Sequence, residues 1–313
     1  MARVFVLGAA HPNGGTFMAY QLGRILESGF GYQPVAVRVG AEVWDKTKHR
    51  YEQEFPIVSV QDMEAIIRKD DLLVANPSFS RHMFGIRIPG KKISYVQHFN
   101  SFSLLDGRFD HYVACSKFVQ NFLLSTYGIS APAIPPYVEA DTAVRSPWTD
   151  RAANSVFTYL KGPHNIATLF FDRLKEIVGA RAQFVHTVNA MTLSRHDLLE
   201  KIAECRFFLS LSPAEGFGLV PLEAMSVGTA VVGLDSFGGR QYFRHMENCA
   251  VASYPNIEEV AAHLIMLCQQ TKTAMAIAER GQETAGQYTY QRYSDAWTSY
   301  FTRTVGLLPI SSY

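Results

Sequence analysis

Short apolar runs alternate with helical periodicity along the first part of the chain. Residues 3–8 form an apolar run that ends at a glycine, and residues 16–27 follow with apolar positions spaced three and four apart. The same alternation predicts further strands at 34–39, 71–76, 92–97 and 111–115, and further helices at 60–68 and 117–127. Strands that alternate with helices are typical of a parallel sheet covered by helices on both faces.

Four prolines interrupt this pattern between residues 129 and 148 and break regular structure there. The alternation then starts again, with strands predicted at 155–160, 183–188, 206–211 and 230–233 and helices at 166–178, 194–204, 219–227, 257–269, 272–287 and 290–304. We therefore expect two doubly wound, Rossmann-like α/β domains over residues 1–140 and 141–289, followed by a C-terminal segment over 290–313. Such sheets bind ligands outside the carboxyl ends of their strands, so two of them facing each other would form a ligand-binding cleft.

The composition provides enough apolar residues for two cores. Of the 313 residues, 48% are apolar and 18% charged, and 29 Lys and Arg balance 28 Asp and Glu. A balanced charge gives no long-range field to concentrate nucleic acid or an anionic membrane, although it does not exclude a nucleic-acid partner. Basic residues gather within 46–50 and 81–92, where solvated surface charge is the favoured interpretation.

The four cysteines are far apart in the sequence and lack the spacing of a metal site, so we expect buried thiols in a reduced cytoplasmic protein. The sequence shows no targeting signal, and no apolar stretch reaches the roughly 18 residues that a membrane span needs. We expect a cytoplasmic protein without a transmembrane segment, and attachment to a membrane surface stays open. The sequence does not indicate an oligomeric state.

The clearest candidate for a ligand site is the loop after the predicted strand at 206–211. Gly216 and Gly218 let the backbone approach a ligand closely, and a predicted helix begins directly after them. The first amides of that helix, on Gly218, Leu219 and Val220, carry partial positive charge and have no partner within the helix. This turn therefore suits a diphosphate.

Two glutamates flank the same turn. Glu215 lies in the loop, and Glu223 follows eight positions later, just over one turn into the helix. Carboxylates accept hydrogen bonds from vicinal hydroxyls, so one could hold a ribose and the other a sugar ring. The alternative is that both only favour the helix dipole or lie at the surface. For Glu223, in an otherwise apolar helix, the sequence favours the ligand-binding interpretation.

The segment 215–232, EGFGLVPLEAMSVGTAVV, resembles the donor-site signature of family 4 retaining glycosyltransferases, which have the GT-B fold. The later Gly238–Gly239 pair also occurs in the family's order. The resemblance implies that Glu215 contacts hydroxyls of the donor sugar at the reacting centre and that Glu223 holds the ribose of a nucleotide-diphosphate sugar. It also implies that the backbone from Phe217 to Leu219, continuing to Val220, takes the diphosphate.

The likeness is weaker over the rest of the chain. Gly14–Gly15 is similar to the family's glycine-rich acceptor-domain loop, which approaches the donor phosphate, although an ordinary turn explains it equally well. The motif Tyr95-Val-Gln-His98, together with residues 114–122, resembles polysaccharide-assembling members, the rhamnan-type ones nearest. This implies that His98 contacts donor or acceptor and makes it, with Glu215, a catalytic candidate. A lone histidine is more often structural, and both interpretations stay open.

Two positions depart from the family's pattern. The family usually has an Arg and a Lys near the start of the second domain to neutralise the diphosphate, whereas this sequence has one clear cation there, Lys161. Arg240, directly after the Gly-Gly pair where relatives often carry an acid, is the other candidate for that task. These departures affect the expected diphosphate contacts and the donor preference.

The C-terminal helix predicted at 290–304 carries an aromatic stripe formed by Tyr293, Ala296, Trp297, Tyr300 and Phe301. In GT-B relatives a C-terminal helix crosses back to the N-terminal domain, and the resemblance implies the same here. Periodicity alone fits packing on its own domain equally well.

Taken with the resemblance, the sequence predicts a retaining transferase in which the acceptor hydroxyl attacks from the face that the leaving diphosphate occupies. The expected acceptor is a hydroxyl on a glycan or a lipid-linked carbohydrate. No Asp-x-Asp motif is present, so we expect neither a metal nor another cofactor. The alternatives are a nucleotide-sugar epimerase, a sugar-phosphate synthase, a binding protein with a decayed site, and a transferase that glycosylates DNA. The sequence does not identify the sugar, the base or the acceptor.

Overall fold

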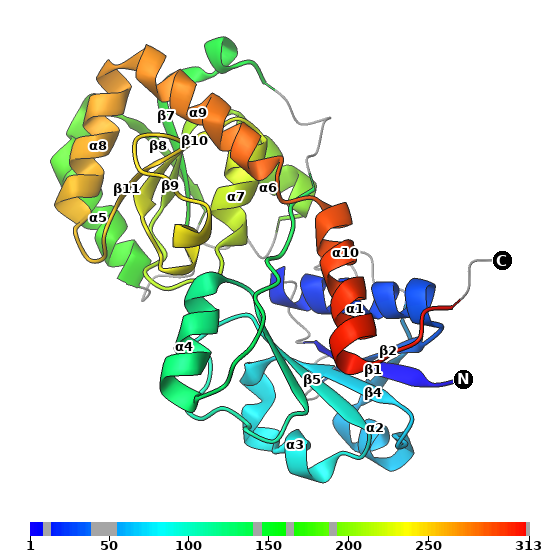
Figure 1. Ribbon diagram of the computed structural model, residues 1–313. Helices are drawn as coiled ribbons and strands as arrows, with labels where there is room; N and C mark the ends of the chain where they lie inside the picture. The colour runs from blue at the N-terminus through cyan, green and yellow to red at the C-terminus, as the bar shows by residue number, and fades with distance from the viewer. Residues whose placement is uncertain (9–13, 39–54, 140–145, 161–165, 188–192, 311–313) are drawn as a thin grey trace. The chain divides into compact units, whose positions relative to one another are not determined.

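The computed structural model describes residues 1–8, 14–38, 55–139, 146–160, 166–187 and 193–310. The chain forms two compact units. The first contains Met1–Pro136 and, after a return of the chain, Gln291–Tyr313, and the second contains Tyr137–Tyr290. Each unit is built on a parallel sheet covered by helices, so the α/β fold with two Rossmann-like sheets that the sequence predicts is confirmed (Figure 1).

The sheet of the first unit has six parallel strands in the order β3-β2-β1-β4-β5-β6. The strands are β1 (Arg3–Gly8), β2 (Gln33–Arg38), β3 (Ile57–Ser59), β4 (Leu72–Ala75), β5 (Lys91–Val96) and β6 (His111–Ala114). The helices are α1 (Gly14–Phe30), α2 (Val60–Ile66), α3 (Phe84–Arg87) and α4 (Lys117–Tyr127), with a 3₁₀ turn at Pro77–His82. The strand order reverses between β1 and β4, and ligands of open α/β sheets bind at the carboxyl side of such a switch point.

The sheet of the second unit has five parallel strands in the order β11-β10-β9-β7-β8. The strands are β7 (Ala152–Tyr159), β8 (Gln183–Thr187), β9 (Cys205–Ser210), β10 (Ala230–Leu234) and β11 (Ala250–Ala252). The helices are α5 (Ile166–Val178), α6 (Arg195–Ala203), α7 (Leu219–Ser226), α8 (Ile257–Gln269) and α9 (Thr271–Ala285). The order reverses between β7 and β9, so the loop after β9 lies at the switch point of this sheet.

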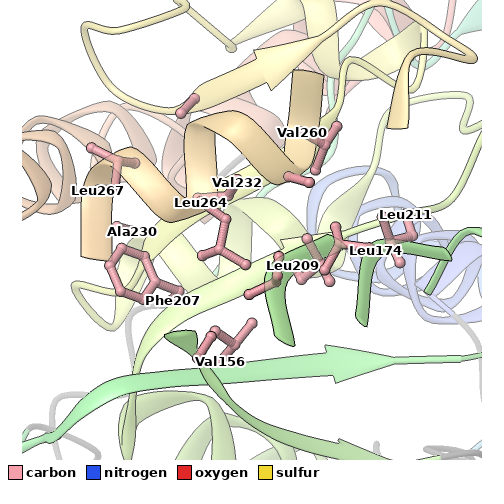
Figure 2. Close-up of a cluster of buried hydrophobic side chains, with 14 of the residues drawn as sticks. Val156, Leu174, Phe207, Leu209, Leu211, Ala230, Val232, Val260, Leu264 and Leu267 are labelled. Carbon is pink, nitrogen blue, oxygen red and sulfur yellow. The ribbon is translucent and has the colours of Figure 1, made fainter. Parts of the chain in front are cut away.

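One hydrophobic core of the second unit lies between this sheet and helices α5 and α8 (Figure 2). Strand residues such as Val156, Phe207 and Val232 face Leu174 of α5 and Leu264 of α8, and all are at most 1% exposed. Strands β7, β9 and β10 therefore bury apolar side chains that hold the loops at their carboxyl ends in place.

Helix α10 (Tyr290–Tyr300), which continues as a π-helical turn (Phe301–Val305), packs on the first unit. Figure 1 shows α10 crossing α1, and the two helices are in contact, because the Tyr293 hydroxyl donates to the carbonyl of Met18 at 3.2 Å. Trp297 is fully buried with its ring 5.2 Å from that of Tyr95 on β5. The aromatic stripe read from the sequence is thus part of the core of the first unit.

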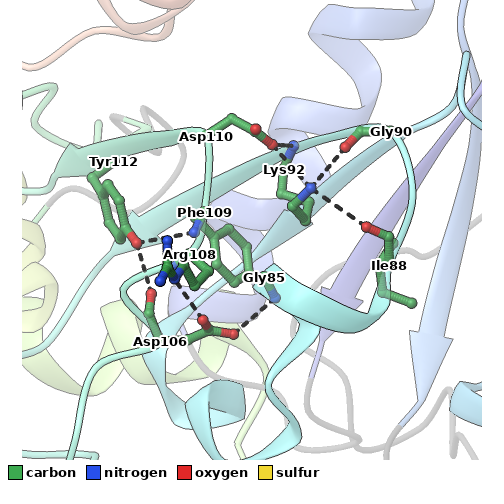
Figure 3. Close-up of polar contacts among 9 residues, drawn as sticks. All are labelled: Gly85, Ile88, Gly90, Lys92, Asp106, Arg108, Phe109, Asp110 and Tyr112. Atoms are coloured by element: carbon green, nitrogen blue, oxygen red, sulfur yellow. Dashed lines mark hydrogen bonds and ion pairs between the residues drawn. The ribbon is translucent and has the colours of Figure 1, made fainter.

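The connection between β5 and β6 is held by a polar cluster (Figure 3). The Lys92 ammonium group is buried, donates to the carbonyl of Gly90 at 2.9 Å and lies 3.2 Å from the Asp110 carboxylate. The buried Asp106 carboxylate accepts from the amides of Gly85 at 2.9 Å and Arg108 at 3.2 Å. A buried charge is stable only when it is paired, so these bonds are expected to persist. They hold the end of the segment 98–110 in place next to β6.

A bilayer-spanning helix is not found in the parts of the chain that the structure describes.

Candidate functional site

The loop after β9 is joined to the loop after β10 by backbone hydrogen bonds. The amide of Glu215 donates to the carbonyl of Ser236 at 3.0 Å, and the amide of Gly238 donates to the carbonyl of Glu215 at 3.0 Å. Ser236 and Phe237 both have positive φ angles, 53° and 58°. Side-chain-bearing residues rarely adopt this conformation, which costs of order 1–3 kcal/mol each, so the surrounding bonds must enforce it. Strained backbone of this kind is concentrated at ligand-binding sites.

Close backbone approach explains why glycines stand at this junction. A Cβ atom at Gly238 would lie 2.4 Å from the carbonyl carbon of Gly216, so no side chain fits between the two loops. Gly218 has a φ of +86° and is the N-cap of α7. Because glycine has no side chain, it leaves the helix without a side-chain cap.

The uncapped start of α7 can bind an anion. The first amides of the helix, on Leu219 and Val220, have no carbonyl partner one turn earlier, and both residues are half-buried. The third helical residue, Pro221, has no amide proton to satisfy. A phosphate group at this position would receive amide hydrogen bonds and the positive end of the helix dipole.

Tyr242 holds this turn in place through its hydroxyl and its ring, and no sequence motif indicated this role. Its hydroxyl donates to the carbonyl of Gly218 at 2.5 Å, and its ring packs against Phe217 with the centroids 5.3 Å apart. Burial raises the pKa of Tyr242 well above its ordinary value, and the nearby carboxylates of Glu215 and Glu223 raise it further. The hydroxyl therefore keeps its proton, and both candidate carboxylates lie close enough to act on the same buried phenol.

The two carboxylates differ in their surroundings. Glu215 is half-buried, and its Oε1 accepts from the hydroxyl of Ser212 at 2.6 Å. Glu223 is 5% exposed, so it is not a solvated surface residue. Its Oε1 accepts from Nε of Arg195 at 3.0 Å. Arg195 is a second residue of this region that the sequence analysis missed, because its contact with Glu223 spans 28 positions and follows no local pattern.

Of the two cations that the sequence analysis selected, the structure describes one. Arg240 binds Asp235, with Nε and Nη2 each 2.7 Å from the carboxylate, and its guanidinium lies over the ring of Phe237. Its side chain is half exposed. The charge of Arg240 is thus partly neutralised by Asp235 before any ligand binds. Lys161 lies outside the described residues.

The candidate residues of the first unit gather at the carboxyl ends of β1 and β5. Gly14 and Gly15 begin α1, and the side-chain amide of Gln97 donates to the carbonyl of Gly15 at 2.9 Å. The next residue, His98, is half-buried, and its ring stacks on Phe99 with the centroids 5.5 Å apart. Its Nδ1 accepts weakly from the amide of Asn100 at 3.4 Å. Gly14, Gly15 and His98 therefore belong to one region of the first unit, and Glu215 to Glu223 with Arg240 belong to one region of the second.

Within the described ranges, no three His, Cys, Asp or Glu side chains are grouped so that they could hold a metal ion.

Comparison with known proteins links part of the second unit to a family. Residues 171–284 match the family model described as glycosyl transferases group 1. The chain is 46% identical over 52 residues to the putative glycosyltransferase ORF330 of Acidianus filamentous virus 2, which is 17% of this chain and 16% of that protein. It is 41% identical over 49 residues to the putative glycosyltransferase 41 of Sulfolobus islandicus filamentous virus, or 16% of this chain and 15% of that protein. The chain thus matches about a sixth of the length of these relatives.

The whole chain resembles solved structures of glycosyltransferases. Anabaena Alr3699/HepE, solved with UDP and glucose, has a TM-score of 0.70 at 15% identity, over 98% of this chain and all of that chain. A glycosyltransferase from Rickettsia africae has a TM-score of 0.69 at 14% identity over 97% of this chain and 98% of that one. The sucrose-phosphate synthase of Thermosynechococcus elongatus has a TM-score of 0.68 at 12% identity, over 98% of this chain and all of that chain. These likenesses show that the fold is GT-B.

Proposed function

We propose that this protein is a retaining glycosyltransferase that moves a sugar from a nucleotide-diphosphate sugar to an acceptor hydroxyl on a glycan or glycolipid. One observation carries the proposal: the uncapped start of α7 lies at the switch point of its sheet, flanked by the carboxylates of Glu215 and Glu223. A nucleotide sugar carries a diphosphate between two rings that bear hydroxyls. The site offers backbone amide donors for the diphosphate and carboxylate acceptors for the hydroxyls of both rings.

The roles proposed for Glu215 and Glu223 are those implied by the family resemblance, and the burial of the two residues supports them. Glu223 is fixed and buried, which suits binding of the ribose, a part of the donor that does not react. Glu215 is more open, and its Oε1 accepts from the hydroxyl of Ser212, a placement that suits contact with the transferred sugar. Backbone amides from Phe217 to Val220 take the diphosphate, and Lys161 and Arg240 are the side chains proposed to add positive charge.

The chemistry that these groups supply is stabilisation of the leaving diphosphate. Negative charge develops on it as the anomeric bond breaks, and preorganised amides stabilise that charge without rearranging. In the proposed mechanism the acceptor hydroxyl attacks from the same face, its proton passes to the departing phosphate oxygen, and configuration is retained. Glu215 and His98, with the Gly14–Gly15 loop, are proposed to hold the sugar, the acceptor and the donor phosphate during this step.

We further propose that the reaction needs no metal ion, since the sequence has no Asp-x-Asp motif to bind one. Activity should survive in EDTA. A complete loss of activity that magnesium or manganese restores would contradict this part of the proposal. A cytoplasmic location belongs to the same proposal and is testable by cell fractionation.

The experiment that tests the function has two steps. A panel of nucleotide-diphosphate sugars is first screened for thermal stabilisation, because a specific ligand raises stability by mass action. The stabilising donor is then incubated with glycan, lipid-linked, sugar-phosphate and duplex DNA acceptors, and nucleotide release is measured. Release that depends on an acceptor supports transfer, and turnover of the donor without any acceptor would favour an epimerase instead. The acceptor that supports release separates a glycan transferase from a sugar-phosphate synthase and from a DNA-modifying enzyme.

A further inference from the structure

Arg195 forms a bridge inside the second unit. It is the first residue of α6, whose start is capped by Ser194 and Asp197. Its Nε donates to Oε1 of Glu223 at 3.0 Å, and its Nη2 donates to the carbonyl of Glu139 at 2.6 Å. The side chains of Arg195 and Glu223 are 12% and 6% exposed, so the ion pair is largely screened from water.

Packing alone does not explain this ion pair. The neighbours of Glu223 on α7, Leu222, Ala224 and Met225, are fully buried apolar side chains. A buried ion pair in such surroundings loses about as much hydration as it gains in attraction, and apolar replacements are often equally stable. The presence of a carboxylate at this buried position is therefore better explained by a role in binding than by a gain in stability.

The second contact of Arg195 fixes the direction of its guanidinium. Glu139 belongs to the segment that enters the second unit, and the amide of its neighbour Val138 donates to the carbonyl of Tyr288 at 3.0 Å. The carboxylate of Glu139 lies 3.8 Å from Nη1 of Arg195. A planar guanidinium held at two edges cannot rotate freely, whereas a lysine ammonium could not make both contacts in the same way.

We propose that Arg195 is a positioning residue for the donor site: it engages Oε1 of Glu223 and directs Oε2 to the ribose hydroxyls of the nucleotide. No partner for Oε2 is found in the described residues. The inference rests on the proposed function, because it assumes that Glu223 binds the ribose. It adds that the preference for ribose depends on a side chain that does not itself touch the ribose.

The experiment compares two probes that differ only in the sugar. Dissociation constants are measured by calorimetry for the ribonucleoside diphosphate that binds most tightly among the four common ones, and for its 2′,3′-dideoxy analogue. The wild type should prefer the ribonucleotide by about tenfold or more, since hydrogen bonds to a carboxylate are lost with the hydroxyls. In Glu223→Gln and in Arg195→Gln the two dissociation constants should differ by no more than about threefold. The double variant should show no smaller preference than either single variant.

A matched control separates positioning from general loss of charge. Arg173 on α5 forms exposed ion pairs with Glu176 and Glu258 in the same unit, and Arg173→Gln should leave the ribose preference unchanged. Arg195→Lys keeps the charge but not the planar group, so it should restore the preference only in part. If Arg195→Gln does not fold, Arg195→Lys decides the question, and a wild-type preference in it overturns the proposal.

The outcomes separate a failure of the proposed function from a failure of the role proposed for Arg195. If the wild type binds none of the four diphosphates, the proposed function fails. If the wild type and Glu223→Gln behave as expected while Arg195→Gln keeps the full preference for ribose, the proposed function stands and the role of Arg195 is wrong.

Discussion

Replacing Tyr242 with phenylalanine removes one hydroxyl from the base of the donor loop and leaves the ring in place. The ring contacts of Tyr242 with Phe217 at 5.3 Å, Phe243 at 4.6 Å and Tyr288 at 6.0 Å should persist. The carbonyl of Gly218 then loses its donor in a buried position, which costs about 1–3 kcal/mol in the free energy of unfolding. Each kcal/mol should lower the Tm by about 2–4 °C in a domain of this size.

The same change should weaken donor binding. The bond from Tyr242 holds Gly218 in its left-handed conformation, which keeps the amides of Leu219 and Val220 directed outward. We expect the variant to bind a nucleotide diphosphate about threefold to tenfold more weakly, as one lost hydrogen bond implies. The pKa of Tyr242 is raised, so the neutral hydroxyl contributes its full stabilisation below the ordinary tyrosine pKa of about 10. The differences in stability and affinity between the wild type and Tyr242→Phe should therefore not change between about pH 6 and 9.

Tyr288→Phe is the matched control. Tyr288 belongs to the same aromatic cluster, but its hydroxyl is hydrogen-bonded to the side chain of Gln241 instead of Gly218. Thermal unfolding and titration calorimetry of both variants measure the difference. If the two variants lose equal stability and equal affinity, the bond to Gly218 has no special role and the reasoning is refuted.

Three further predictions concern Glu215, the C-terminal helix and a half-buried histidine. Glu215→Ala should lower kcat more than it weakens donor binding, because contacts to the transferred sugar act closest to the breaking bond, and steady-state kinetics with calorimetry would reveal the opposite pattern. Trp297→Ala should cost roughly 3–5 kcal/mol in the stability of the first unit, measured by denaturant unfolding, since its side chain is fully buried there; a loss below about 1 kcal/mol would contradict that packing. The pKa of His263 lies below its ordinary value because the ring is partly buried and because its centroid lies 4.8 Å from that of the His245 ring. The unfolded chain therefore binds a proton at His263 more readily than the folded protein does, and the free energy of unfolding should fall as the pH drops through about 6.5. His263→Gln should remove part of that acid-dependent loss in unfolding experiments at pH 5 to 8, and an unchanged pH profile would exclude the histidine as its source.

The sequence predicts the α/β architecture well because most of the longer strands are buried apolar runs. Residues 206–211 are an example, since β9 spans Cys205–Ser210 and is buried along most of its length. The short strands β3 and β11 were missed because three residues are too few to show a period. The turn at Gly216 and Gly218 was predictable for a different reason, since glycine spacing before a helix is a local signal.

The supporting residues of the site could not be predicted in the same way. Arg195 contacts Glu223 across 28 positions, and Tyr242 contacts Gly218 across 24. Both contacts join segments that are far apart in the sequence, since Arg195 begins α6 and Glu223 lies within α7, and neither Arg195 nor Tyr242 belongs to a periodic or spaced motif. Members of the family that the sequence resembles often carry an acid directly after the Gly-Gly pair, where this sequence has Arg240, and that departure did not indicate the role of Tyr242.

The stereochemistry of transfer is the decisive measurement for a retaining glycosyltransferase. The stabilising donor, of known anomeric configuration, is incubated with the acceptor that supports nucleotide release, and the new glycosidic bond is followed by proton NMR from the first turnovers. We expect a product with the anomeric configuration of the donor, and we expect Glu223→Gln to lose that product when the donor is limiting. A product of inverted configuration, or a Glu223→Gln variant with wild-type donor affinity and rate, would contradict the proposed function.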